Sequence, residues 1–249
     1  MSETLRDQDS KHFFWICKMK KRERGLFDEE YKLSKISKHG DPLEKLNLRI
    51  DFEQFRPFLN EAFTKEHRGI GGAKPFDYVM MFKIVILQRY YSISDGQTEY
   101  QINDRLSFMR FLGLTLGDQV PDEKTIWLFR DTLTKSGMIE KLFDKFTDIL
   151  AQKGLIVNAG TIVDASFVEV PRQRNSREEN ETIKNGEIPP DWKTKPHKLQ
   201  QKDTDARWTK KDEKTYFGYK DHVKIDKGSK LIQKFTVTNA SVHDSQEME

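Results

Sequence analysis

Residues 161–170, TIVDASFVEV, decide how the second half of this chain folds. β-Branched and aromatic side chains dominate the stretch, and they favour a strand that packs against other structure. One carboxylate, Asp164, interrupts this apolar run. Because burying an unpaired carboxylate is costly, the sequence predicts that Asp164 has a partner in the core. That partner is a metal ion in one interpretation, and a lysine or a capped turn in the other.

Two segments further along the chain are also typical of strands. Residues 216–225, YFGYKDHVKI, alternate in polarity, and residues 231–238, LIQKFTVT, follow a turn signal at Lys227 and Gly228. Short connections between successive strands favour an antiparallel meander. The sequence therefore predicts a meander that begins with the strand holding Asp164.

A long polar insert, residues 171–214, separates the first of these strands from the second. A loop of this length is usually functional or disordered. Trp192 and Trp208 lie among its many basic residues, a mixture suited to phosphate contact and base stacking; a solvated mobile loop is the alternative. The candidate DNA ligands in the insert are Lys195, Lys198, Lys202, Arg207, Lys210 and Lys211. Lys220 and His222 on the next strand are further candidates, although alternation predicts that they simply face outward from the sheet.

The first half of the chain has helical spacing from about residue 41 to residue 153. Residues 78–91, YVMMFKIVILQRYY, are apolar nearly all round, which predicts the central helix of a bundle. Asp77 and Asp122 are placed to cap helices, and Gly154 to end one. Residues 100–112 carry a single apolar stripe and are expected to be helical. Arg130, one turn from Ile126, is a candidate DNA ligand.

Residues 1–40 are predicted to form a basic arm rather than a folded core. Its candidate DNA ligands follow an aromatic knot and are Lys18, Lys20, Lys21, Arg22 and Arg24.

Composition narrows the class of protein. The 249 residues, with 33% charged and 11% aromatic side chains, suggest one large domain or two small ones with a packed core. The single cysteine excludes an intramolecular disulfide and a cysteine-based zinc site. No apolar run is long enough to span a membrane, and the polar N-terminus does not resemble a signal peptide, so we expect a cytoplasmic protein, which would be nucleoid-associated if its basic segments bind DNA.

Eight stretches together resemble a known family over about residues 24–249. They are RGLFDEE (24–30), GDPLEKLN (40–47), PFDYVMMFKIVILQRYYSISDGQTEYQINDRLSFMRFLGL (75–114), PDEKTIWLFRDTL (121–133), TIVDASFVEVPRQRN (161–175), DTDARWTKK (203–211), YFGYKDHVKID (216–226) and VTNASVHDSQ (237–246). Any one of them is a weak signal. As a set, they resemble a bacterial insertion-sequence transposase of the DDE class, in the group numbered five.

The resemblance implies an α+β protein with three parts. A basic arm (1–40) is followed by a helical DNA-binding region (41–153) and by an incomplete RNase H-like domain (154–249) that holds the first three strands only and the basic insert. The implied partners are double-stranded DNA, both the terminal inverted repeats and the target, with a homodimer on DNA. The implied cofactor is Mg²⁺ or Mn²⁺ in the full-length enzyme, bound weakly or not at all here.

In this family three acids hold two divalent ions, and here the chain departs from the pattern. Asp164 matches the first acid, on the first strand. The second acid belongs at the end of the fourth strand and the third is a glutamate on a later helix, so both are expected beyond Glu249. Asp244 is the alternative second metal ligand. Counting strands places it after the third, however, where an aspartate caps a helix.

Several function classes therefore remain open. The parent protein is expected to cut and join DNA, and this chain, with one of three acids, is expected to be C-terminally truncated and inert by itself. The alternative is a truncated DNA-binding remnant or regulator that occupies transposon ends. A frameshifted element with a second reading frame is a third possibility. Another RNase H-like nuclease is a fourth, against which the helical N-terminal match argues.

Overall fold

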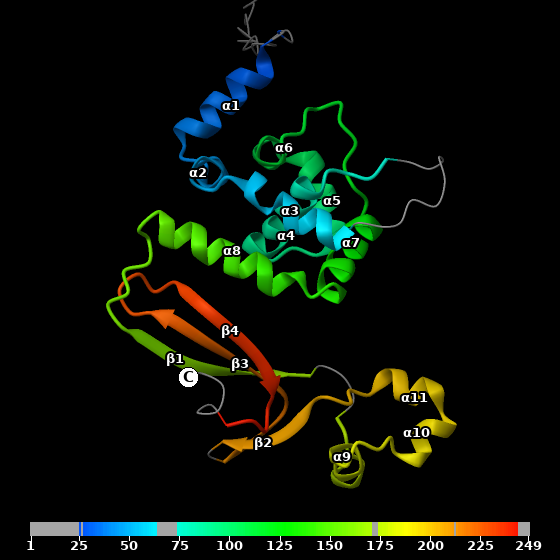
Figure 1. Ribbon diagram of the computed structural model, residues 1–249. Coiled ribbons are helices and arrows are strands. Elements are labelled where there is room, and N and C mark those ends of the chain that lie inside the picture. Colours follow the sequence, from blue (N-terminus) through cyan, green and yellow to red (C-terminus); the bar gives the residue numbers. More distant parts are fainter. Residues whose placement is uncertain (1–24, 26, 64–73, 171–173, 212, 244–249) are drawn as a thin grey trace, which may run out of the picture.

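The computed structural model describes residues 25, 27–63, 74–170, 174–211 and 213–243. Within these residues the protein is α+β, with a helical N-terminal region followed by an antiparallel sheet, as the sequence predicts (Figure 1). The elements of the helical region are α1 (Asp28–Lys38), α2 (Pro42–Arg49), the 3-10 helix η1 (Phe52–Phe55), α3 (Arg56–Phe63), α4 (Tyr78–Tyr91), α5 (Asp95–Asp104), α6 (Leu106–Leu112), α7 (Glu123–Lys135) and α8 (Met138–Gln152). Part of the predicted basic arm is therefore the helix α1.

Helix α4 is the centre of the helical region, and its predicted bounds are confirmed. It contacts α3, α5, α6 and α7, and Ile84 and Leu87 are completely buried in the shared core. Asp77 caps the helix by accepting a hydrogen bond from the backbone N–H of Met80 at 2.9 Å. An apolar circumference thus gives a helix that is buried on most sides.

Residues 100–112 are helical, as expected, but they belong to two helices rather than one. Arg105 has an extended backbone (φ −110°, ψ 112°) that separates α5 from α6. Both short helices pack against α4, but α5 also packs against α7 whereas α6 also packs against α2. Tertiary packing therefore overrides a stripe that is continuous in the sequence.

The sheet is built around one long central strand. Its members are β1 (Thr161–Glu169), β2 (Arg207–Lys211), β3 (Lys214–Asp226) and β4 (Ile232–Asn239). β1 and β4 pair antiparallel with the second part of β3, and β2 pairs with its first part. The predicted order β1, β3, β4 is confirmed. The expectation of three strands is wrong, because β2 lies in the segment that we predicted as a loop.

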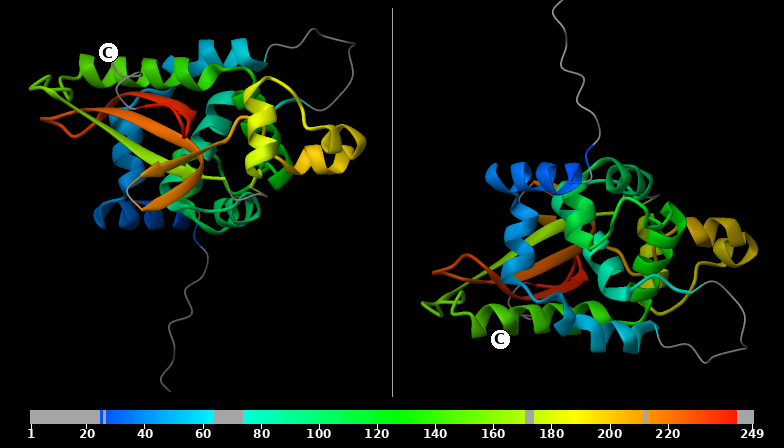
Figure 2. Two further views of the ribbon diagram at one scale, coloured as in Figure 1. Left: turned by 90° about the horizontal axis from the view of Figure 1, so that it is seen from below. Right: turned by 90° about the horizontal axis from the view of Figure 1, so that it is seen from above.

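The polar insert is a folded lobe, so the loop prediction is also wrong. It contains α9 (Arg177–Lys184), α10 (Pro190–Thr194) and α11 (Pro196–Gln201), which stand to one side of the sheet (Figures 1 and 2). Ser176 and Glu179 form a reciprocal capping box that starts α9, and prolines start α10 and α11. These start signals are present in the sequence, but the high charge of the segment obscures them.

Helix α8 covers one face of the sheet. The rings of Phe143 on α8 and Phe235 on β4 meet edge to face, with their centroids 4.9 Å apart. Strand register places Phe235 beside Val223 and Val223 beside Asp164. Because directly paired residues point to the same face of a sheet, Asp164 points to the α8 side. Residues next to these in sequence point to the opposite face.

Gly218 allows β1 and β3 to approach each other closely. Its φ is +154°, and a Cβ at this position would overlap the backbone oxygen of Val168. We predict that Gly218→Ala pushes β1 away and lowers the free energy of unfolding by about 1–3 kcal/mol. The measurement is thermal unfolding together with hydrogen exchange of the β1 amides. Gly117→Ala is the control, since no atom lies within 4 Å of its Cβ position; equal effects of the two variants would contradict the prediction.

Candidate functional site

Asp164 is exposed, which corrects the expectation of a buried carboxylate. Within the described residues β1 pairs only with β3, so β1 forms an edge of the sheet. Helix α8 lies over β4 and leaves every residue of β1 partly or fully exposed. One Asp164 oxygen accepts a hydrogen bond from the backbone N–H of Ala165 at 2.8 Å. The other is available to a ligand from solvent.

A second carboxylate, Asp221, lies on the same face of the sheet. It pairs with Ser166, two residues from Asp164 along β1, so the two acids are diagonal neighbours. Such neighbours in an antiparallel sheet lie roughly 7–8 Å apart. One carboxylate oxygen of Asp221, Oδ1, is buried and has no hydrogen-bond partner among the described residues. Sequence reasoning missed Asp221, because the meander was predicted without the register that aligns it with Asp164.

Carboxylate oxygens are the ligands that Mg²⁺ prefers, so this pair fits a hard divalent cation in kind. The pair provides only two ligand side chains, however. The described residues contain no group of three or more His, Cys, Asp or Glu side chains placed to hold a metal ion. Asp244, the other candidate ligand, lies outside the described residues. The candidate site therefore consists of Asp164 with Asp221 beside it.

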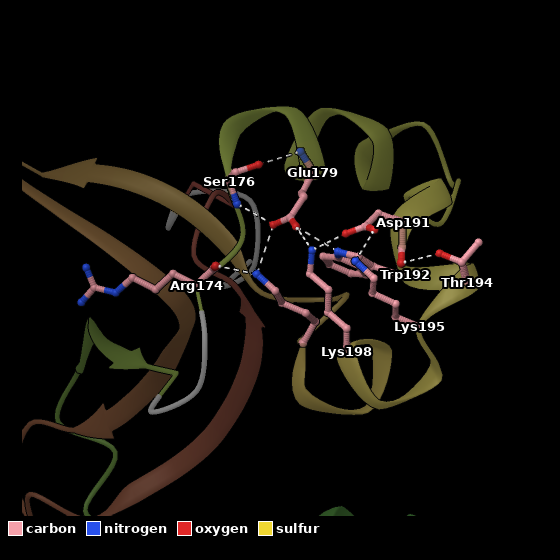
Figure 3. A network of polar contacts seen from close by, with 9 residues as sticks. Arg174, Ser176, Glu179, Asp191, Trp192, Thr194, Lys195 and Lys198 are labelled. Atoms are coloured by element: carbon pink, nitrogen blue, oxygen red, sulfur yellow. Dashed lines mark hydrogen bonds and ion pairs between the residues drawn. The ribbon is translucent and has the colours of Figure 1, made fainter.

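The insert lobe is organised around the largely buried carboxylate of Glu179 (Figure 3). It accepts hydrogen bonds from the Trp192 indole N–H at 2.9 Å, the Ser176 backbone N–H at 2.8 Å and the Lys202 ammonium at 3.1 Å. Burial alone would raise the pKa of Glu179, but these donors outweigh it and lower the pKa to about 2. Glu179 therefore remains ionised and holds α9 to the rest of the lobe.

This network uses the basic residues that we predicted as DNA ligands. Lys195 and Lys198 form ion pairs with Asp191 at 3.0 and 2.7 Å, and Lys202 pairs with Glu179. Trp192 is completely buried, so the expectation that it stacks on a nucleic-acid base is wrong. The mixture of aromatic and basic residues here forms a small core.

The remaining candidates differ in their availability. The Arg130 guanidinium makes two hydrogen bonds with Asp95, at 2.7 and 2.9 Å, and a third with Gln88. Arg207 donates to the backbone oxygens of Thr204 and Ala206. These contacts hold neighbouring segments together and leave few donors for phosphate.

Lys220 and His222 are buried, which corrects the expectation that they face outward. Lys220 donates to the Val242 carbonyl at 2.6 Å, and His222 Nε2 lies 2.9 Å from the Thr238 hydroxyl. By contrast, Lys210 and Lys211 are exposed at the tip of the β2–β3 hairpin. The five candidates of the N-terminal arm, Lys18 to Arg24, lie outside the described residues.

Two family models match this chain. Residues 31–132 match the family described as Transposase domain (DUF772), and residues 158–249 match the Transposase DDE domain. The chain belongs to the insertion-sequence DDE transposases. No solved structure matches it.

The two matches correspond to the two halves of the transposase fold. The first begins within α1 and ends within α7, and the second begins just before β1 and includes both Asp164 and Asp221. DDE transposases act on DNA and generally use a divalent metal. In the described part of the chain, no helix has the length and apolar character needed to cross a membrane.

Ionisation of Glu179 predicts how the lobe responds to acid. Because its pKa is lowered on folding, its contribution to stability is complete above about pH 4.5 and is lost as the pH falls toward 2. We predict that Glu179→Gln removes roughly 2 kcal/mol of local stability at neutral pH. Hydrogen exchange across residues 176–202 measures this. Glu181→Gln, an exposed position on the same helix, is the control, and unchanged exchange in Glu179→Gln would show that the network is dispensable.

Proposed function

We propose that this transposase binds the terminal inverted repeats of its insertion sequence and that Asp164 takes part in cutting and joining DNA by two-metal phosphoryl transfer. The observation that carries the proposal is an exposed carboxylate, inside the region matching the Transposase DDE domain, with the unpartnered oxygen of Asp221 on the same face. The antiparallel order β1, β3, β4 is what we expect of the start of an RNase H-like domain.

Exposure of Asp164 suits a duplex substrate. A DNA double helix cannot enter an enclosed cavity, so the acids that act on its backbone must lie where a broad surface can approach. The β1–β3 ladder fixes the position of Asp164, and one of its oxygens is oriented by the Ala165 N–H. Asp164 and Asp221 would hold a divalent cation by their carboxylate oxygens. Two such ions, when bound, supply activation of the attacking oxygen and stabilisation of the leaving oxygen.

DNA binding does not require a complete metal site. Lys210 and Lys211 are exposed and extend from the end of the sheet, where phosphates can reach them. Phosphate contacts release counterions, so binding should weaken steeply as salt rises. Transposition joins two DNA ends, and we therefore propose that two copies of the protein assemble on DNA.

The central prediction separates binding from cleavage. A labelled duplex carrying the ends of the element should bind this chain more tightly than a scrambled duplex. Asp164→Asn should keep this binding and lose any Mg²⁺-dependent strand cleavage, because the amide is a poorer ligand for a hard cation. Anisotropy measures binding and a denaturing gel measures cleavage. Equal affinity for the two duplexes would refute end recognition, and cleavage that persists in Asp164→Asn would refute the role of Asp164.

A second candidate function is a protein that occupies transposon ends without cutting them. The described residues bring together two acids, whereas the family mechanism uses three, and this favours the second candidate. The same experiment distinguishes the two. Specific binding with no cleavage in the wild-type chain supports the end-occupying protein, and specific binding with Asp164-dependent cleavage supports the transposase.

The hairpin lysines should contribute affinity but not sequence preference, because a lysine reads a phosphate as a point charge. We predict that Lys210→Gln with Lys211→Gln weakens binding to element-end and scrambled duplexes by the same factor. Titrating both duplexes with the double variant gives the ratio of the two affinities. A change in that ratio would mean that these lysines contact bases.

A further inference from the structure

The sheet contains two lysine pairs, and in each pair the two lysines lie directly opposite one another on neighbouring strands. Lys224 on β3 is paired with Lys234 on β4, and Lys211 on β2 is paired with Lys214 on β3. Like charges in directly opposed positions of a sheet are destabilising. Two such pairs on one small sheet therefore need a physical reason.

Both pairs lie on the face that is turned away from α8. Lys234 is adjacent to Phe235, which contacts α8, so its side chain points to the opposite face. Lys224 shares that face because it is paired with Lys234. At the other end of β3, the Lys211 ammonium lies 5.8 Å from the centre of the Phe167 ring. Phe167 is three residues from Asp164 on β1, so its side chain points to the opposite face from Asp164, away from α8.

No acid neutralises these four lysines within the described residues, where no ion pair involves any of them. Two carboxylates of the strands themselves share the face, one on β3 and one on β1, and both have other partners. Asp226 accepts hydrogen bonds from the backbone N–H groups of Val157, Asn158 and Ser229 and from the Ser229 hydroxyl. Glu169 pairs with Arg174 at 3.2 Å. Among the described residues no ion pair thus offsets either lysine pair, although Glu213 lies in the turn between Lys211 and Lys214.

Three lysines of the insert lobe differ from the two lysine pairs because each of them forms an ion pair. Lys195, Lys198 and Lys202 each have a carboxylate within 3.4 Å. Among the described residues the four lysines of the two pairs have no such partner, although the chain contains 40 acidic residues for its 43 basic ones. What distinguishes the two pairs is that each holds two lysines directly opposite one another without an ion pair, and this pattern is suited to an external polyanion.

We propose that the two lysine pairs, Lys211–Lys214 and Lys224–Lys234, bind the sugar–phosphate backbone of double-stranded DNA irrespective of its sequence. The inference rests on the proposed function and extends it to this face of the sheet. Lys214 and Lys224 lie ten positions apart on β3, and ten steps of an extended strand span at most roughly 33 Å. One turn of B-DNA is about 34 Å long, so a single duplex can reach both pairs within one turn.

The test compares double variants that remove the same net charge. Lys224→Gln with Lys234→Gln removes one pair, and Lys211→Gln with Lys214→Gln removes the other. Lys184→Gln with Lys193→Gln is the matched control, since both are exposed lysines of the insert lobe outside the proposed surface. Each protein is titrated into a random-sequence duplex over a range of salt concentrations, and its thermal midpoint is recorded.

Each pair variant should bind the duplex roughly tenfold more weakly or worse at low salt, and its salt slope should fall by about 1.8, which corresponds to two lost phosphate contacts. Its thermal midpoint should be unchanged or higher, because a repulsive pair has been removed. Lys234→Glu gives a second readout. It places opposite charges across the strands, so it should raise the thermal midpoint and weaken DNA binding.

Affinities and salt slopes that match the lobe control would overturn the proposal. A lower thermal midpoint in the Lys224–Lys234 variant together with normal DNA binding would also overturn it, by assigning the pair a structural role. Loss of binding to anionic lipid vesicles with DNA binding retained would assign the face to a membrane instead. If the wild-type chain binds no duplex, the proposed function itself fails. If the wild-type chain binds the duplex tightly and the lysine variants bind it equally well, only the role of the lysine pairs is rejected and the proposed function stands.

Discussion

The antiparallel ladder between β1 and β3 is the constraint on which the rest of the candidate site depends. It aligns Asp164 with Val223 and Ser166 with Asp221, and so brings two carboxylates to one face. It also divides the side chains of β3 between the face under α8 and the face that carries the lysine pairs. Gly218 is necessary for this ladder, because any side chain there would occupy the space of the β1 backbone. Local backbone sterics thus fix the register, and the register distributes charge between the two faces.

Charge is used in two different ways in the second half of the chain. In the insert lobe, lysines and carboxylates neutralise one another around Trp192, and partly buried ion pairs give the lobe a defined shape. On the sheet, lysines face lysines. A sequence count of basic residues cannot separate these two situations, because both segments are equally rich in lysine. What separates them is the distance from each ammonium to the nearest available carboxylate.

Several features of the fold could be predicted because their causes are local. Asp77 and Asp122 cap helices through contacts three residues away, and the apolar surface of α4 needs only the chain's own periodicity. The break at Arg105 could not be predicted, since it depends on which helices α5 and α6 contact. The same is true of Asp221, whose relation to Asp164 exists only once two strands are in register. The fold of the insert could be predicted only in part. Its capping box and prolines are visible in the sequence, but the partners of Glu179 come from two other helices.

The exposure of Asp164 changes the reason for regarding it as functional. A buried carboxylate would need a cation to offset its desolvation, whereas an exposed one is well solvated and has no such need. The residue type of Asp164 and its position on an apolar strand are therefore not enough to identify it as a metal ligand. The adjacent Asp221 supplies the missing physical reason, because one of its oxygens is removed from water without a hydrogen-bond donor from the described part of the chain. A cation that bridged the two carboxylates would satisfy that oxygen, and the solvated Asp164 would complete the contact at little desolvation cost. On this view the partly buried Asp221 would create the demand for a cation, and the exposed Asp164 would make the site accessible to DNA.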